Sequence, residues 1–139
     1  TLGYDELFAY SDPMSPVNVL IYAPDTQLGW HFDSSSFTVT LMLRPAEMGG
    51  LYQYAPFIRS EGDPGFGAVE NILDGNLNGV LELEQAAGDL VIFRGAMTLH
   101  RVTQVEGSAT RLLSALSYSP QPQYELNPAT RRIFYGRES

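Results

Sequence analysis

The chain has 139 residues, which suggests a single domain that is long enough to bury a core of its own. Its 8 basic and 16 acidic residues give a net charge of −8, which argues against a nucleic-acid binder and against docking on an anionic membrane. The chain contains no cysteine, so disulfides, thiolate catalysis and zinc–cysteine sites are excluded, and this composition fits a cytoplasmic protein.

Short runs rich in β-branched and aromatic residues follow one another along the chain, separated by Gly, Pro, Asn and Asp turns. These runs predict strands at Val17–Tyr22, Phe37–Leu43, Leu51–Tyr54, Val80–Leu83, Leu90–Phe93, His100–Val105 and Arg111–Tyr118. Helical periodicity is confined to Thr1–Tyr10 and Ala68–Leu73. No apolar run reaches the roughly 18 residues of a membrane span. We therefore expect one all-β domain over residues 1–139, either a sandwich or a barrel.

The only two histidines of the chain, His31 and His100, are candidates for binding a metal. Asp33 lies two positions after His31, and residues two apart on a strand face the same side. Two imidazoles and one carboxylate on one face of a metal form the triad that is associated with non-haem Fe(II) oxygenases. Three protein ligands leave three positions of an octahedral iron, which suffice for a chelating 2-oxo acid and dioxygen. The pattern therefore predicts an iron site at His31, Asp33 and His100.

Arg111 follows His100 in a predicted strand, where it shares a face with Leu113, Ala115 and Ser117. A guanidinium can hold a carboxylate with two parallel hydrogen bonds, so we expect Arg111 to bind the distal carboxylate of 2-oxoglutarate. Arg101 is the alternative, but it is adjacent to His100 and should face the opposite side of its strand. Each of these residues alone has a simpler interpretation as a structural histidine, a surface turn or a salt-bridging arginine.

Taken together, His31-x-Asp33, His100 and Arg111 resemble the double-stranded β-helix family of Fe(II)/2-oxoglutarate-dependent oxygenases. Segments 37–43, 49–54, 88–95 and 100–103 are similar to the core strands of that family, and the closing segment 132–137 resembles a bacterial subgroup of amino-acid hydroxylases and free-amino-acid halogenases. The resemblance implies a jelly-roll, cupin-like barrel. It also implies Fe(II), 2-oxoglutarate and O2 as cofactors, and a small-molecule substrate that is an amino acid or a derivative.

Position 33 separates the two chemistries of that subgroup. Halogenases resemble this pattern but carry glycine where this chain has Asp33, and the glycine frees a coordination position for chloride. The resemblance therefore implies hydroxylation of an unactivated carbon, with release of succinate and CO2. Family members also carry a longer N-terminal helical region than the thirty or so residues that precede His31. Either the natural protein is short, or the chain is a core domain that lacks this region, in which case an uncovered apolar sheet face would favour a homo-oligomer or a partner.

Three further residues are candidates for contacting the substrate: Trp30, Arg59 and Ser117. Trp30 is adjacent to His31, Arg59 lies in a long loop where a lid is expected, and Ser117 occupies an inward-facing strand position. A buried structural tryptophan and a solvated loop are the simpler interpretations of the first two. Tyr22 and Tyr54 are candidates for hydrogen bonding to the cosubstrate.

Other classes of function stay open. A cupin-type dioxygenase would need no 2-oxoglutarate, but cupins tend to use more histidine ligands and would give Arg111 no role. A non-enzymatic jelly-roll module, either a degenerate oxygenase or a sugar-binding domain, is a second alternative. A Ca²⁺-dependent lectin would need clustered oxygen ligands, and segment 74–78, the one such cluster, is more simply a turn. A catalytic pair of carboxylates, such as Glu82 and Glu84, is a third alternative, although a solvated strand face explains these residues more simply.

Overall fold

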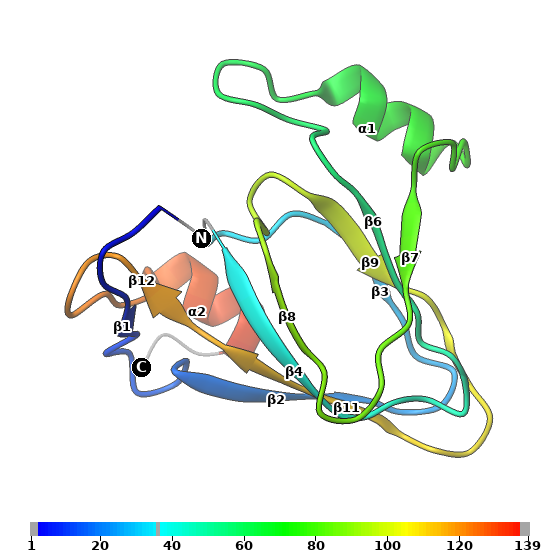
Figure 1. Cartoon of the computed structure of the whole chain (residues 1–139), viewed down its shortest axis with the longest axis horizontal. Coiled ribbons are helices and arrows are strands. Elements are labelled where there is room, and N and C mark those ends of the chain that lie inside the picture. The colour runs from blue at the N-terminus through cyan, green and yellow to red at the C-terminus, as the bar shows by residue number, and fades with distance from the viewer. Residues whose placement is uncertain (1–2, 36, 137–139) are drawn as a thin grey trace.

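The computed structural model describes residues 3–35 and 37–136, which form two antiparallel β-sheets with two short helices (Figure 1). The strands are β1 (Phe8–Ala9), β2 (Val17–Tyr22), β3 (Leu28–His31), β4 (Thr38–Arg44), β5 (Met48–Gly49), β6 (Tyr52–Ala55), β7 (Leu81–Leu83), β8 (Leu90–Phe93), β9 (Leu99–Val102), β10 (Val105–Glu106), β11 (Arg111–Leu116) and β12 (Tyr118–Ser119). The helices are α1 (Phe66–Leu73) and α2 (Pro128–Tyr135).

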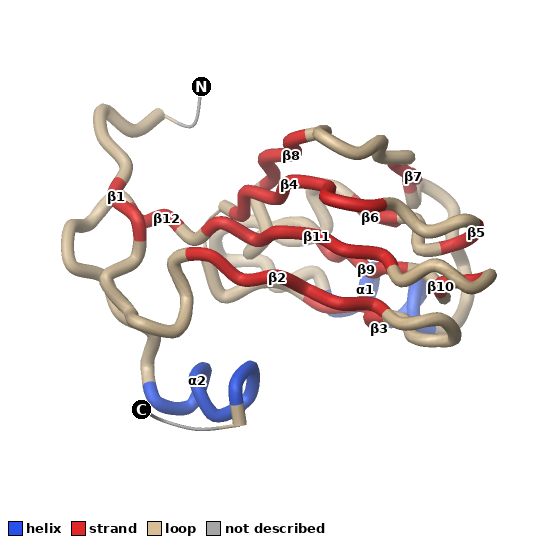
Figure 2. The backbone as a smooth tube through the Cα atoms, turned by 90° about the horizontal axis from the view of Figure 1, so that it is seen from below, coloured by secondary structure: helices blue, strands red, loops and turns tan. Residues whose placement is uncertain are grey.

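The two sheets have strand orders β2-β11-β4-β8 and β3-β9-β6-β7, and two-stranded ribbons β1-β12 and β10-β5 extend them. The chain alternates between the sheets, so that neighbours within each sheet are distant in sequence. Figure 2 shows the two sheets as superposed layers, with β2, β11 and β4 in front of β3, β9 and β6. This arrangement is an all-β jelly roll, the double-stranded β-helix class, and the predicted fold class is confirmed.

Apolar and aromatic side chains fill the space between the sheets. Tyr22 of β2 packs with Val102 of β9, in the other sheet, and with Val105 in one buried cluster. The rings of Tyr52 and Phe93 meet across the two sheets with their centroids 5.3 Å apart. These contacts close the barrel around the interior in which the candidate site residues lie.

The two edge strands of the β2-β11-β4-β8 sheet, β2 and β8, carry apolar side chains that are exposed to solvent. Val17, Val19 and Ile21 are 62%, 53% and 70% exposed along β2, and Leu90 and Ile92 are 55% and 51% exposed along β8. Exposed apolar patches of this kind mark surfaces that another segment or molecule covers. The homo-oligomer expected from the sequence stays a prediction, and these two strands carry the surface through which it would form.

Several predicted elements differ from those observed. The strand predicted at 100–105 is divided into β9 and β10. The pairing of β9 with β6 ends at Val102, and the Gln104 carbonyl instead accepts a hydrogen bond from the Gly50 N–H at 2.8 Å. The helix predicted at 1–10 is wrong for the part that the structure describes, since Phe8–Ala9 pairs with Tyr118–Ser119 as β1, while Thr1 and Leu2 lie outside the described residues. Neither of the two described helices, each eight residues long, approaches the length and apolar character that a membrane crossing requires.

Helix α2 was not predicted, although its boundaries follow from local chemistry. The Asn127 side chain accepts a hydrogen bond from the Thr130 N–H at 2.9 Å, and Pro128 occupies the first helical position. Gly136 ends the helix in the left-handed conformation at φ 69°, with its N–H donating to the Arg132 carbonyl at 3.0 Å. Asparagine before, proline at the start and glycine at the end are the residues that such caps favour.

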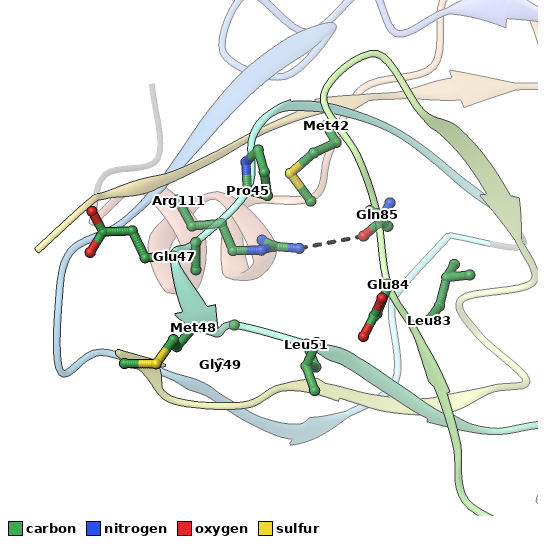
Figure 3. A pocket seen from close by; sticks show the side chains of 12 residues that line it. Met42, Pro45, Glu47, Met48, Gly49, Leu51, Leu83, Glu84, Gln85 and Arg111 are labelled. Atoms are coloured by element: carbon green, nitrogen blue, oxygen red, sulfur yellow. Dashed lines mark hydrogen bonds between the residues drawn. The ribbon is translucent and has the colours of Figure 1, made fainter. Parts of the chain in front are cut away.

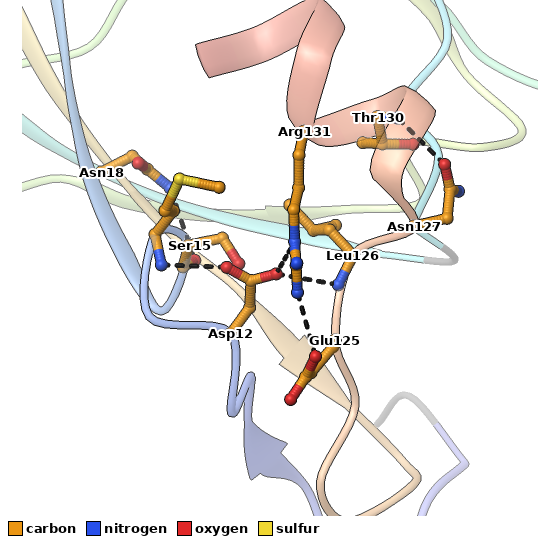
Figure 4. A network of polar contacts seen from close by, with 9 residues as sticks. Asp12, Ser15, Asn18, Glu125, Leu126, Asn127, Thr130 and Arg131 are labelled. Atoms are coloured by element: carbon orange, nitrogen blue, oxygen red, sulfur yellow. Dashed lines mark hydrogen bonds and ion pairs between the residues drawn. The ribbon is translucent and has the colours of Figure 1, made fainter. Parts of the chain in front are cut away.

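A buried carboxylate ties α2 to the N-terminal segment (Figure 4). Asp12 is fully buried and accepts hydrogen bonds from the Met14 N–H at 2.9 Å, the Leu126 N–H at 3.1 Å and the Arg131 Nε–H at 2.7 Å. Arg131 also pairs with Glu125 at 3.0 Å. Burial would raise the pKa of Asp12, but these hydrogen bonds and the Arg131 charge outweigh burial and hold that pKa below its ordinary value.

Asp12→Asn is expected to lower the thermal unfolding midpoint by about 5 °C at pH 7, because a neutral amide replaces a buried carboxylate that three donors hold. A folded-state pKa below the unfolded value, about 4, stabilises the fold above that pH, and this contribution is lost as pH falls through the folded-state pKa. The difference between the parent and the variant should therefore shrink as pH falls below 4. Unfolding monitored by circular dichroism from pH 7 to pH 2 measures it, with exposed Asp5→Asn as the control. A pH-independent difference would contradict the electrostatic explanation.

Candidate active site

The structure brings His31, Asp33 and His100 together at one end of the barrel. His31 ends β3 and lies opposite His100 of β9 in the antiparallel register, with the ring centroids 4.1 Å apart. Asp33 lies two residues beyond the end of β3, and its Oδ1 is 3.7 Å from His31 Nε2 and 3.5 Å from His100 Nε2. One ligand atom from each of the three residues lies within 4.8 Å of the other two.

Both imidazoles are oriented by backbone carbonyls. His31 Nδ1 is 2.8 Å from the Gly29 carbonyl, and His100 Nδ1 is 2.8 Å from the Thr98 carbonyl. A carbonyl can only accept a hydrogen bond, so each Nδ1 carries a proton, and in the neutral form of each imidazole Nε2 presents a lone pair for a metal. Burial, followed by the neighbouring His100, lowers the pKa of His31, which keeps that imidazole neutral and able to bind a metal. In metal-binding histidines, a hydrogen bond from the ring nitrogen that does not bind the metal fixes the tautomer in this way.

Asp33 is held so that one carboxylate oxygen faces the two imidazoles. Its N–H donates to the Gly95 carbonyl at 3.0 Å, and its Oδ2 accepts a hydrogen bond from the Thr38 hydroxyl. Burial would raise the pKa of Asp33, but the His100 imidazole and the Thr38 hydroxyl outweigh burial and lower that pKa, so the carboxylate is ionised at neutral pH. Oδ1 is thereby left as the ligand atom.

The donor set fits a small, octahedral divalent ion. Metal bonds of about 2.1 Å at right angles place neighbouring ligand atoms about 3 Å apart. The distances of 3.5 and 3.7 Å from Asp33 Oδ1 to the two Nε2 atoms are slightly wider, so a modest inward movement would complete three adjacent bonds. Two imidazoles and one carboxylate are the ligands of the non-haem iron triad, and the residues present therefore fit Fe(II).

Arg111 lies apart from this cluster, in a cavity of about 420 Å³ that none of the three metal-ligand candidates lines (Figure 3). It is 1% exposed, and its NH2 group lies at the limit of a hydrogen bond, 3.5 Å from Gln85 Oε1. Its NH1 group has no hydrogen-bond partner within the part of the chain that the structure describes. Burial lowers the pKa of Arg111, but a guanidinium stays charged at neutral pH. A buried guanidinium with these contacts has the charge and the donors that a carboxylate ligand would need.

Tyr22 connects the two parts of the interior. The Arg111 guanidinium lies 5.1 Å from the centre of its ring. Burial raises the pKa of Tyr22, the Arg111 charge opposes this rise and the Asp33 charge adds to it. Tyr22 is therefore influenced by the charges of both Arg111 and Asp33.

Tyr52 is a residue of the interior that the sequence reasoning missed. Its ring lies 5.6 Å from the His100 ring, and its buried hydroxyl has no hydrogen-bond partner among the described residues. Burial, followed by the Asp33 charge, raises the pKa of this hydroxyl, which is therefore a neutral donor. The strand alternation contained the signal, because Tyr52 shares a strand face with Tyr54, which was considered.

Arg59 stacks on a residue of the metal-ligand segment, and its predicted substrate contact stays a prediction. Its guanidinium stacks at 3.5 Å on the ring of Phe32, which lies between two of the metal-ligand candidates in sequence. Its NH1 donates to the Ala96 carbonyl at 3.3 Å, and its Nε is buried without a hydrogen-bond partner among the described residues.

Trp30 and Ser117 have other surroundings. Trp30 packs against the buried cluster of Ala55, Ile72 and Leu99, which is the structural role that a tryptophan commonly has. The Ser117 N–H donates to Pro16, and its carbonyl accepts from Tyr10, both at 3.1 Å, so its backbone joins the N-terminal segment to the sheet. The predicted substrate contacts of both residues stay predictions.

Arg101 faces away from the site, as the alternation of β9 predicts. Its Nε donates to Gln53 Oε1 at 2.6 Å, and its guanidinium lies 4.7 Å from the centre of a Trp30 ring. Arg101 is therefore a poor alternative to Arg111 for holding a ligand inside the barrel.

Comparison with known proteins supports the resemblance found in the sequence. The profile of the halogenase D family matches residues 9–132, which include the three metal-ligand candidates and Arg111. The chain belongs to the halogenase D family. Membership of this halogenase D family protein supports its suspected resemblance to the subgroup of hydroxylases and halogenases. No curated protein matches the chain.

The fold of this halogenase D family chain also has a solved counterpart. The crystal structure of an oxidoreductase of the 2OG-Fe(II) oxygenase family from Burkholderia pseudomallei aligns with it at 20% identity and a TM-score of 0.54. The alignment covers 76% of this chain and 42% of the Burkholderia chain, so the matched region is less than half of that protein. At this identity the likeness concerns the fold.

Proposed function

We propose that this chain is an Fe(II)- and 2-oxoglutarate-dependent hydroxylase of a small molecule. The observation that carries the proposal is the convergence of His31 Nε2, His100 Nε2 and a carboxylate oxygen of Asp33 within 4.8 Å of one another. When bound, Fe(II) with 2-oxoglutarate and O2 supplies the oxidising power to replace a C–H bond of an unactivated carbon by C–OH, with release of succinate and CO2.

The residues of the chain contribute positions and charge to this reaction. His31 and His100 would hold the iron through imidazoles whose Nδ1–H groups are already engaged. Arg111 would grip the distal carboxylate of 2-oxoglutarate, since a buried guanidinium with an unpaired nitrogen is complementary to a carboxylate. The Tyr52 hydroxyl would donate a further hydrogen bond to the cosubstrate from within the barrel.

Asp33 favours hydroxylation over halogenation. The resemblance implies that halogenases carry glycine at this position, and chloride then takes the place of the carboxylate. Here the Asp33 carboxylate is ionised and faces both imidazoles, so the coordination position that chloride would need is taken. Halogenation is the second candidate because of the family to which the chain belongs, and a chloride-dependent product would support it.

The proposed substrate is an amino acid or a derivative with a carboxylate. Arg59 supports this proposal, because its guanidinium stacks beside the metal-ligand segment with a buried nitrogen that is unpaired within the described residues. A smaller cavity of about 170 Å³ is lined by Ser34 and Ser35, which follow Asp33 in sequence, and by Tyr124.

The first test is spectroscopic. Anaerobic addition of Fe(II) and 2-oxoglutarate to the purified chain should produce a visible metal-to-ligand charge-transfer band. A folded protein that produces no band would contradict the proposal and favour a non-enzymatic module. A screen of amino acids for stimulated succinate release, with mass detection of the product, then identifies the substrate. Oxidation of a substrate without succinate would favour a cupin-type dioxygenase.

Tyr52→Phe should have opposite effects on stability and on ligand binding. Without ligand, the thermal midpoint is expected to rise by about 2–3 °C, because a buried hydroxyl with no partner among the described residues is removed. The Kd for 2-oxoglutarate is expected to rise about fivefold, because one hydrogen bond worth about 1 kcal/mol is lost. Thermal unfolding and ligand titration measure the two effects. Tyr54→Phe is the control, and a fivefold loss in Tyr54→Phe instead would transfer the role to Tyr54.

A further inference from the structure

Gly95 lies against the Asp33 side chain with no room for a side chain of its own. A Cβ added to Gly95 would lie 2.7 Å from both Cβ and Cγ of Asp33, and closer still to Oδ2. The three heavy atoms nearest to that position all belong to Asp33. Carbon atoms pack at about 3.5–4.0 Å, so a methyl group at position 95 and the Asp33 carboxylate cannot both keep their present places.

The backbone cannot relieve this contact without losing hydrogen bonds. The Asp33 N–H donates to the Gly95 carbonyl, and the Ala96 N–H donates to the Ser35 carbonyl, each at 3.0 Å. These two bonds join the loop after β3 to the loop after β8. The Thr38 hydroxyl holds Asp33 Oδ2 from a third side. Any shift of Asp33 away from position 95 would therefore break contacts that aim Oδ1 at the two imidazoles.

Backbone conformation does not explain the glycine at this position. Ten other described glycines have a positive φ, but Gly95 does not, so alanine could adopt its backbone angles. The closest contacts of a side chain at position 95 would therefore be with the ligand residue at position 33.

We propose that Gly95 is the positioning residue that makes room for a carboxylate ligand at position 33. With glycine at position 95, position 33 can carry the carboxylate that completes the metal triad. A side chain at position 95 would occupy that space, so position 33 could not then carry a carboxylate in the same place. The choice between a carboxylate and an open coordination position is thus set by two residues, one on each of the two joined loops. This inference rests on the proposed function in taking Asp33 as a metal ligand.

A double-mutant cycle tests the coupling in metal-free protein. Gly95→Ala is expected to lower the thermal midpoint by about 5 °C or more when Asp33 is present, because overpacking is destabilising. In the Asp33→Gly background the same substitution should lower it by less than about 2 °C, since the clashing atoms are gone. Gly67→Ala is the matched control, because Gly67 lies in α1 with nothing within 4 Å of an added Cβ. Equal losses in the two backgrounds would overturn the inference.

Anaerobic Fe(II) titration supplies a second readout that general destabilisation would not move. Gly95→Ala should weaken Fe(II) binding about tenfold or more with Asp33 present, as loss of an outer contact to a ligand does, and less than about twofold with Asp33→Gly. If the parent itself fails to bind Fe(II), the proposed function fails, whereas the thermal cycle still decides the role of Gly95. A Gly95→Ala protein with the Fe(II) affinity and the thermal midpoint of the parent would overturn the inference while leaving the proposed function intact.

Discussion

Replacing His100 with glutamine is expected to weaken Fe(II) binding by about a thousandfold or more and to abolish substrate-stimulated succinate release. Loss of an outer contact to a metal ligand costs about 10–100-fold in affinity, so loss of a ligand itself costs more. Glutamine retains much of the volume of the imidazole in a position that is 4% exposed and in contact with the Phe93 and Tyr52 rings. Anaerobic Fe(II) titration with quantification of bound iron measures the effect.

Arg101→Met is the matched control for that experiment, because Arg101 follows His100 on the same strand and points to the opposite side. It should keep the Fe(II) affinity within about twofold, which is about 0.4 kcal/mol. A His100→Gln protein that is folded and binds Fe(II) as the parent does would contradict the metal site.

Replacing Arg111 with methionine is expected to raise the Kd for 2-oxoglutarate at least about a hundredfold while leaving Fe(II) binding within about threefold. Truncating one partner of a buried, hydrogen-bonded charge pair costs about 2–5 kcal/mol. Methionine is apolar and similar in length to arginine, and it would lie in the same cavity beside Met42, Leu51 and Leu83. The ligand-free protein should therefore remain at least as stable as the parent. Titration of the charge-transfer band with 2-oxoglutarate at saturating Fe(II) separates the two affinities.

Two variants sharpen the Arg111 experiment. Arg111→Lys keeps a charge but loses the planar pair of donors, so its Kd should fall between those of the parent and of Arg111→Met. Arg101→Met should leave the Kd for 2-oxoglutarate within about twofold. If Arg101→Met instead causes the hundredfold loss, Arg101 holds the cosubstrate and the assignment of Arg111 is wrong.

The metal-ligand cluster could be predicted because its signal is short and rare. The chain has two histidines, and one of them lies two positions before an aspartate. Strand alternation alone does not explain the position of Asp33, however. Strand alternation was expected to put His31 and Asp33 on one side, but β3 ends at His31. The hydrogen bond from the Asp33 N–H to Gly95 holds the aspartate in place after the strand has ended.

Contacts between distant parts of the chain could not be predicted in the same way. Nothing in the local pattern around Gly95 indicates that its missing side chain makes room for Asp33, because the two are brought together by loops of different sheets. The pairing of Asp12 with Arg131 joins positions 119 residues apart. Neither contact has a sequence period, so each depends on the completed fold.

Helix α2 differs from these contacts, since its signals were present in the sequence. Asn127, Pro128 and Gly136 are the residue types that begin and end helices. The eight residues between the caps are too few for a strong hydrophobic period, and most of that helix is half-buried or exposed. Capping chemistry was the better guide for this short element.

The Arg111 NH1 group and the Tyr52 hydroxyl have no hydrogen-bond partner among the described residues, and this has a consequence for the stability of the protein in the cell. A buried polar group without a partner costs about 1–3 kcal/mol, and a charged one costs more. If 2-oxoglutarate binds as proposed, it would pair with Arg111 and so complete the core as well as take part in the reaction. Ligand that binds the folded state shifts the unfolding equilibrium by mass action. The abundance of this protein under proteolysis would then follow the supply of 2-oxoglutarate, so that a shortage of the cosubstrate would remove the catalyst as well as slow it.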